Sequence, residues 1–72
     1  MVTNTEMLRD AIKARGLKYN YVAEQLGITP YALQKKIDNE NDFWAREIYI
    51  LTSVLGLSRK ERDDIFFAKN SD

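Results

Sequence analysis

The spacing of apolar residues along the chain predicts an all-α fold of five short helices. Apolar positions recur three or four residues apart within each segment, and no stretch alternates with period two, as a half-buried strand would. The second, third and fourth helices are expected at residues 19–26, 30–37 and 44–55. The first precedes Gly16 and the fifth follows Ser58.

Capping signals mark the expected helix ends. Thr3 and Glu6 have the spacing of a capping box, and Ser58 and Glu61 repeat that spacing at the start of the last helix. The residues expected to end the first, second and fourth helices in left-handed conformations are Gly16, Gly27 and Gly56.

Length and composition argue for one domain without catalytic chemistry. The chain has 72 residues and contains neither cysteine nor histidine. This excludes disulfides, thiolate or imidazole metal sites and the usual general base. Asp63 and Asp64 are adjacent, so on a helix they point about 100° apart and do not share a proton. We therefore expect no enzyme, catalytic residue, metal or cofactor, and no small-molecule ligand.

The chain shows no signal for a membrane. Its first six residues lack the basic segment and apolar run of a signal peptide. The longest apolar stretches, 48–51 and 65–68, are far too short to span a bilayer. A cytoplasmic protein is expected.

Charge is balanced overall but unevenly distributed. The formal net charge is zero, yet residues 1–37 carry +3 and residues 38–72 carry −3. Such an asymmetry is able to create one side that faces phosphate. A chance distribution of charges would produce the same difference, so both interpretations stay open.

Residues 19–38 have the pattern of two helices joined by a three-residue turn. Ala23 is small where the helices must cross closely, and Gly27 suits the positive φ of the turn. Ile28 is expected beneath the turn and Leu33 against the core. Thr29 followed by Pro30 fits the start of the second helix of the pair. That helix would stand on the surface, free to enter a DNA major groove.

This pattern resembles the Cro/repressor-type helix-turn-helix family. The matching positions are Val22, Ala23, Leu26, Gly27, Ile28 and Leu33. More loosely, the stretch LGITPYALQKKI, the polar loop with Phe43 after it and the ending DDIFF are similar to small Cro-like proteins of phages and prophages. The resemblance implies a single compact five-helix, lambda-repressor-like domain over residues 1–72, with a helix-turn-helix core at 19–38.

Three positions depart from the family pattern. Lys36 stands where an apolar residue is common, Asn39 where glycine is common, and Trp44 where a serine or threonine cap is usual. Asparagine tolerates the left-handed conformation better than most residues. Trp44 is expected either to fill the core or to contact DNA backbone or a partner.

The resemblance also implies which residues contact DNA. Carried over by position, the base contacts fall on Thr29, Pro30, Tyr31, Gln34 and Lys35. Glutamine pairs with adenine and lysine donates to guanine, whereas Pro30 offers apolar contact only. Expected phosphate contacts are Lys18, Tyr19, Lys36, Asn39 and Asn41. The neighbouring acids Asp38, Glu40 and Asp42 would oppose phosphate, unless their loop points away.

Helices four and five carry more apolar residues than one buried stripe needs. Surplus apolar side chains in a small protein are typical of an interface. We predict a two-fold homodimer through Ile50, Val54 and Phe67, which would require a pseudo-palindromic DNA site. Complete burial in a wrapped five-helix core is the alternative.

Two functions fit these features. The first is a sequence-specific regulator of transcription, a Cro-like repressor that occupies a double-stranded DNA operator. The second is a protein-interaction module of the same fold, such as an antirepressor, antitoxin or accessory subunit. Zero net charge and the acidic loop favour the second.

Overall fold

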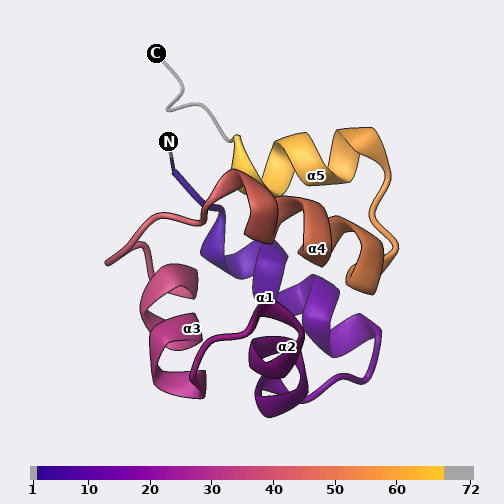
Figure 1. The fold of residues 1–72 in the computed structure, drawn as a ribbon. Coiled ribbons are helices and arrows are strands. Elements are labelled where there is room, and N and C mark those ends of the chain that lie inside the picture. The colour runs from indigo at the N-terminus through magenta and orange to yellow at the C-terminus, as the bar shows by residue number, and fades with distance from the viewer. Residues whose placement is uncertain (1, 68–72) are drawn as a thin grey trace.

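The computed structural model describes residues 2–67, which form five helices (Figure 1). They are α1 (Thr5–Ala14), α2 (Tyr19–Leu26), α3 (Pro30–Ile37), α4 (Ala45–Leu55) and α5 (Arg59–Phe66). Within residues 2–67 there is no strand, so the all-α prediction is confirmed. In the same part of the chain, every helix is too short or too polar to cross a membrane.

The helices surround one apolar core. Figure 1 shows α4 and α5 side by side at one end of the molecule and α2 with α3 at the other, and α4 packs directly on α2. Each helix contributes its apolar stripe, and Phe43 stacks edge-to-face on Phe66 with ring centroids 5.4 Å apart. The buried apolar residues are Leu8, Ile12, Val22, Ala23, Leu26, Leu33, Ile37, Phe43, Ile48, Leu51, Leu55, Ile65 and Phe66.

The predicted glycine stops are confirmed, and one of them has a side-chain partner. Gly56 has a φ of 62° after the last residue of α4. The Arg15 guanidinium, from the end of α1, donates to the carbonyl oxygens of Leu55 at 2.6 Å and Gly56 at 3.3 Å. A cation on these unpaired carbonyls stabilises the C-terminus of α4.

The capping box predicted at Thr3 and Glu6 is wrong. Asn4 is the N-cap of α1, and its Oδ1 accepts a hydrogen bond from Met7 N at 3.1 Å. Thr3 is buried because its backbone pairs with the Asn39 side chain, far along the chain. A tertiary contact therefore moves the start of α1 by one residue.

The second capping box, at Ser58 and Glu61, is confirmed. Ser58 Oγ accepts from Glu61 N at 3.1 Å, and Glu61 Oε1 accepts from Ser58 N at 2.8 Å. The hydrogen bond from the Ser58 backbone N–H has the largest effect, and the Ser58 hydroxyl the next largest. Together they hold the pKa of Glu61 below its ordinary value of 4.5. A lowered folded-state pKa means that this stabilisation is present above pH about 4.5 and is lost as the pH falls through the folded pKa.

Asn39 ties the exit of α3 to the start of the chain. Its φ is 65°, the left-handed conformation expected for this position. Its Oδ1 accepts from Thr3 N at 2.9 Å, and its Nδ2 donates to Thr3 O at 2.7 Å and to Thr5 Oγ1 at 3.3 Å. Thr5 Oγ1 in turn donates to the carbonyl oxygen of Ile37, the last residue of α3.

Substitution of Asn39 should separate its conformational role from its hydrogen bonds. Asn39→Ala loses the bonds and adds left-handed strain, so we expect the free energy of unfolding to fall by about 2–4 kcal/mol. Asn39→Gly loses the same bonds but relieves the left-handed strain, so it should lose only about half of that free energy. Urea unfolding followed by circular dichroism measures both. If both variants unfold at the wild-type midpoint, the side-chain bonds contribute nothing to stability.

Candidate nucleic-acid interface

The turn between α2 and α3 is fixed by backbone and side-chain hydrogen bonds. Gly27 has a φ of 70°, and Ile28 N donates to Ala23 O at 3.0 Å while the Ile28 side chain packs against the core. Thr29 caps α3 by accepting from Ala32 N at 3.1 Å, and Pro30 occupies its first turn. These contacts set the angle at which α3 leaves the turn.

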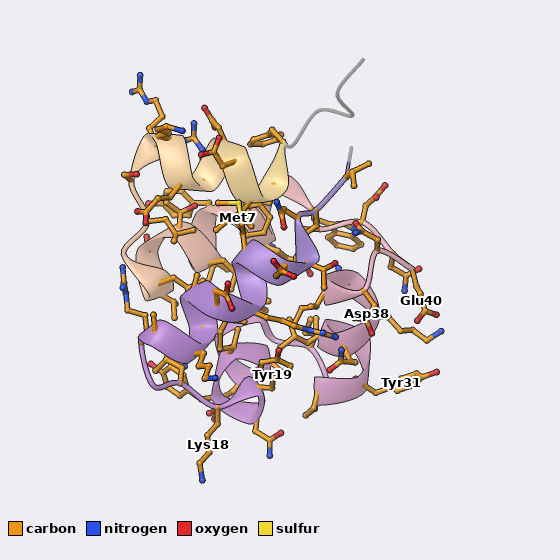
Figure 2. All side chains as sticks on the ribbon, turned by 180° about the vertical axis from the view of Figure 1, so that it is seen from behind. Met7, Lys18, Tyr19, Tyr31, Asp38 and Glu40 are labelled. Carbon is orange, nitrogen blue, oxygen red and sulfur yellow. The ribbon has the colours of Figure 1, made fainter. Side chains whose placement is uncertain are left out.

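The α3 helix has one buried side and one exposed side. Leu33 and Ile37 are completely buried, whereas Tyr31 is 71% exposed. Gln34 and Lys35 are half-buried and lie three and four residues after Tyr31, on the same face of the helix. Figure 2 shows Tyr31 directed outward from α3. We call Tyr31, Gln34 and Lys35 the α3 ridge.

The polar groups of the α3 ridge bond to acidic neighbours. Gln34 Nε2 donates to Asp38 Oδ2 at 3.0 Å, and Lys35 Nζ lies 3.5 Å from Glu40 Oε1. The same ammonium lies 5.2 Å from the centroid of the Tyr31 ring. Such exposed interactions contribute little to stability, so the ridge is able to exchange them for other partners at low cost.

Thr29 and Pro30, the other predicted base contacts, have less to offer a base. Both are exposed at the start of α3. The Thr29 hydroxyl oxygen already accepts the capping bond, and proline has no N–H. Thr29 therefore keeps its O–H as a donor beside the ridge, and Pro30 offers apolar contact only.

Lys18 and Tyr19 lie where α2 begins. Lys18 is the exposed N-cap, and Figure 2 shows its side chain extending away from the molecule. No side chain caps α2, so the N–H groups of its first turn have no side-chain partner at the cap. Tyr19 is half-buried against the core, which leaves its backbone N–H, rather than its ring, as the group suited to phosphate.

The prediction that Lys36 contacts phosphate is wrong. Lys36 is only 8% exposed, and its Nζ lies 2.6 Å from Glu47 Oε1. Asn39 also leaves the predicted phosphate set, because its side chain is occupied by Thr3 and Thr5. Asn41 is exposed in the loop after α3 and remains a candidate.

The acidic loop lies beside the α3 ridge. Figure 2 shows Asp38, Glu40 and Tyr31 on the same side of the molecule. Arg9 from α1 reaches Asp38 Oδ1 at 2.9 Å, and Lys35 partners Glu40. The carboxylates are thus partly neutralised by cations that face the same surface, and Asp42 is exposed nearby in sequence.

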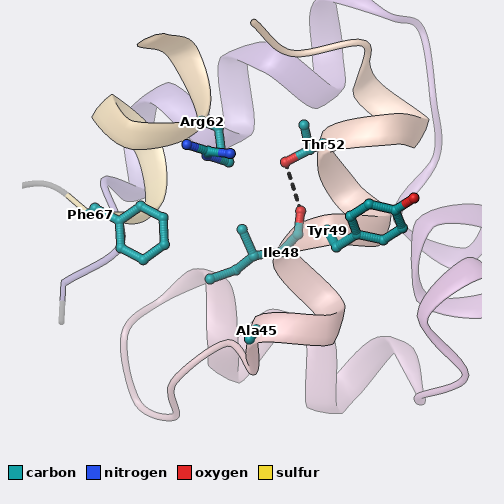
Figure 3. A pocket seen from close by; sticks show the side chains of 6 residues that line it. All are labelled: Ala45, Ile48, Tyr49, Thr52, Arg62 and Phe67. Atoms are coloured by element: carbon teal, nitrogen blue, oxygen red, sulfur yellow. Dashed lines mark hydrogen bonds between the residues drawn. The ribbon is translucent and has the colours of Figure 1, made fainter. Parts of the chain in front are cut away.

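The predicted dimer trio does not form one surface. A pocket of about 450 Å³ between α4 and α5 is lined by Phe67 but by neither Ile50 nor Val54. Those two side chains are half-buried against the core, and helical spacing places them on the side of α4 opposite Tyr49 and Thr52. The residues that line the pocket (Figure 3) are Ala45, Ile48, Tyr49, Thr52, Arg62 and Phe67.

Trp44 is not a core residue. Its side chain is 65% exposed, and the residue is the N-cap of α4. Its ring centroid lies 5.1 Å from Lys36 Nζ, within the range of a cation–π contact. The alternative in which Trp44 fills the core is therefore excluded.

Comparison with known proteins identifies no match. No family model, no curated protein and no solved structure matches the chain. The candidate interface is accordingly defined by its own geometry: the α3 ridge, Lys18 with the first turn of α2, and Asn41.

Proposed function

We propose that this protein is a sequence-specific regulator of transcription, a Cro-like repressor that binds an operator in double-stranded DNA. In this proposal α2 and α3 act as a helix-turn-helix, and α3 enters the major groove. The observation that carries it is the two-sided character of α3. Leu33 and Ile37 anchor the helix in the core while Tyr31, on the other side, is 71% exposed.

The chemistry of the α3 ridge suits base edges. The Gln34 amide matches the N6 and N7 groups of adenine, and the Lys35 ammonium matches O6 and N7 of guanine. The Tyr31 ring suits a thymine methyl group. Each well-formed bidentate contact discriminates against the wrong base by about 1–3 kcal/mol.

Two cations outside the ridge suit the phosphate backbone. Lys18 extends from the start of α2, and Arg9 lies within 2.9 Å of Asp38 beside the ridge. On DNA, Arg9 and Lys35 would exchange carboxylates for phosphates or bases. The displaced Asp38 and Glu40 would lower non-specific affinity, which favours discrimination between sequences.

Salt dependence tests this proposal directly. We expect a labelled random-sequence duplex to bind in 50 mM salt and to lose affinity about 100-fold by 200 mM, as four phosphate contacts require. Fluorescence anisotropy measures both dissociation constants. Absence of binding in 50 mM salt would exclude the proposed function.

Single substitutions should separate base contacts from phosphate contacts. Gln34→Ala is expected to relax preference at one base position of a duplex selected from a random pool. Lys18→Ala should weaken all duplexes alike, by about threefold to tenfold, and reduce the salt slope by about one. Titration of a panel of single-base variants measures the difference. If both substitutions affect the panel identically, the assignment of roles is wrong.

A protein-interaction module is the second candidate. The acidic partners of Gln34 and Lys35 favour it, because they neutralise the surface that DNA would need to be positive. The exposed Tyr49 and Phe67 beside the apolar pocket favour it as well (Figure 3). The same salt titration discriminates between the candidates, since such a module would leave the duplex unbound in 50 mM salt.

A further inference from the structure

A buried ion pair links α3 to α4. Lys36 is the penultimate residue of α3, and Glu47 lies in the first turn of α4. Their Nζ and Oε1 atoms are 2.6 Å apart, with the residues 8% and 2% exposed. Among the ion pairs within residues 2–67, no other connects these two helices.

Trp44 completes this site from the residue that precedes α4. Glu47 Oε1, the atom that meets Lys36, also accepts from the Trp44 backbone N–H at 2.8 Å. The Trp44 ring lies 5.1 Å from the ammonium and shields it from solvent on one side. The same oxygen of Glu47 thus caps α4 and pairs with Lys36 of α3. Among the described residues, no buried side-chain nitrogen or oxygen lacks a hydrogen-bond partner.

The energetics of such a pair do not favour a role in stability. Removing two charges from water costs several kcal/mol, which their attraction only approximately repays, so well-packed neutral residues are often as stable. The geometric consequence is different. Apolar contacts such as those of Leu33 are not directional, whereas the buried Lys36 ammonium must stay within hydrogen-bonding distance of Glu47, because a buried charge without its partner is strongly destabilising.

We propose that Lys36 and Glu47 are positioning residues that fix the orientation of the α3 ridge, which makes them determinants of DNA sequence discrimination. The inference rests on the proposed function. Lys36 directly follows Lys35 and lies two residues after Gln34, so any rotation of the last turn of α3 displaces both side chains. Asn39 and Thr5 hold the end of the same turn from the α1 side. The turn is therefore held from two directions.

A neutral double variant separates positioning from stability. Lys36→Met combined with Glu47→Gln removes both charges and keeps an oxygen that accepts from Trp44 N. The matched control is Lys60→Met with Asp64→Asn, which neutralises an exposed ion pair with an N–O distance of 2.8 Å on α5. We expect both double variants to melt within about 5 °C of the wild type.

Amide hydrogen exchange tests the geometric part without DNA. The exchange rates of residues 36–41 should rise about tenfold or more in the Lys36/Glu47 variant, whereas those of α1 and α5 stay unchanged. The control should leave residues 36–41 unchanged. If residues 36–41 of the Lys36/Glu47 variant exchange at the wild-type rate, the proposal is overturned. Failure of that variant to fold would also overturn it, because the ion pair would then be required for stability.

Binding to a selected duplex tests the functional part. A duplex selected from a random pool by the wild type and a scrambled duplex of the same composition serve as probes. The ratio of their dissociation constants should shrink about tenfold in the Lys36/Glu47 variant, mainly through weaker binding of the selected duplex. An unchanged ratio would overturn the inference. If the wild type selects no duplex from the pool, the proposed function fails, while the exchange rates still decide whether the pair positions α3.

Discussion

Replacement of Tyr31, Gln34 and Lys35 together by alanine is expected to abolish sequence-specific DNA binding while leaving the fold intact. Losing these contacts, at about 1–3 kcal/mol each, should weaken binding to a selected duplex by 100-fold or more. All three side chains lie on the exposed side of α3, so the melting temperature should move by only a few degrees. Anisotropy titration with the selected duplex measures the loss.

A control variant distinguishes the α3 ridge from exposed side chains in general. Tyr49→Ala with Lys60→Ala removes an exposed tyrosine and an exposed lysine from α4 and α5, outside the α3 ridge. It should bind the selected duplex within twofold of the wild type. Equal losses in the two variants would show that the ridge is not the site of recognition.

Local spacing in the sequence predicted most of the fold. The bounds of α2 and α3, the left-handed glycines and the box at Ser58 and Glu61 were all expected, because each depends on residues within one helical turn. Thr29 as the cap of α3 belongs to the same group. Such contacts need only neighbours in the sequence, and they fail where a distant partner competes, as Asn39 does for Thr3.

The predictions that failed depend on partners distant in sequence. Thr3 was expected to cap the first helix, but its backbone bonds instead to the side chain of Asn39, 36 residues away. Lys36 was expected at the surface, but it is buried in a bond to Glu47, 11 residues away. The spacing of apolar residues does not reveal partners that are distant in the sequence. A lysine in an apolar position was the one available signal, since a buried cation requires a carboxylate nearby.

The candidate interface was predictable only in part for the same reason. Helical spacing placed Tyr31, Gln34 and Lys35 on one face. It did not show that Asp38 bonds to Gln34 and that Glu40 pairs with Lys35. These interactions change how strongly the surface attracts phosphate. These exposed bonds cost little to break, so they leave the side chains of the α3 ridge accessible to other partners.

Phe66→Ala is expected to unfold the protein, while the adjacent Phe67→Ala is nearly neutral. Phe66 is 1% exposed and stacks on Phe43, so its truncation should cost about 3–5 kcal/mol, which is the whole stability of a domain of this size. Phe67 is 44% exposed and should cost less than about 1 kcal/mol. The helical circular dichroism signal at 25 °C, with and without urea, measures both. A Phe66→Ala protein that melts within 5 °C of the wild type would mean that α5 is not part of the folding unit, and that residues 2–57 suffice to hold α3 in place.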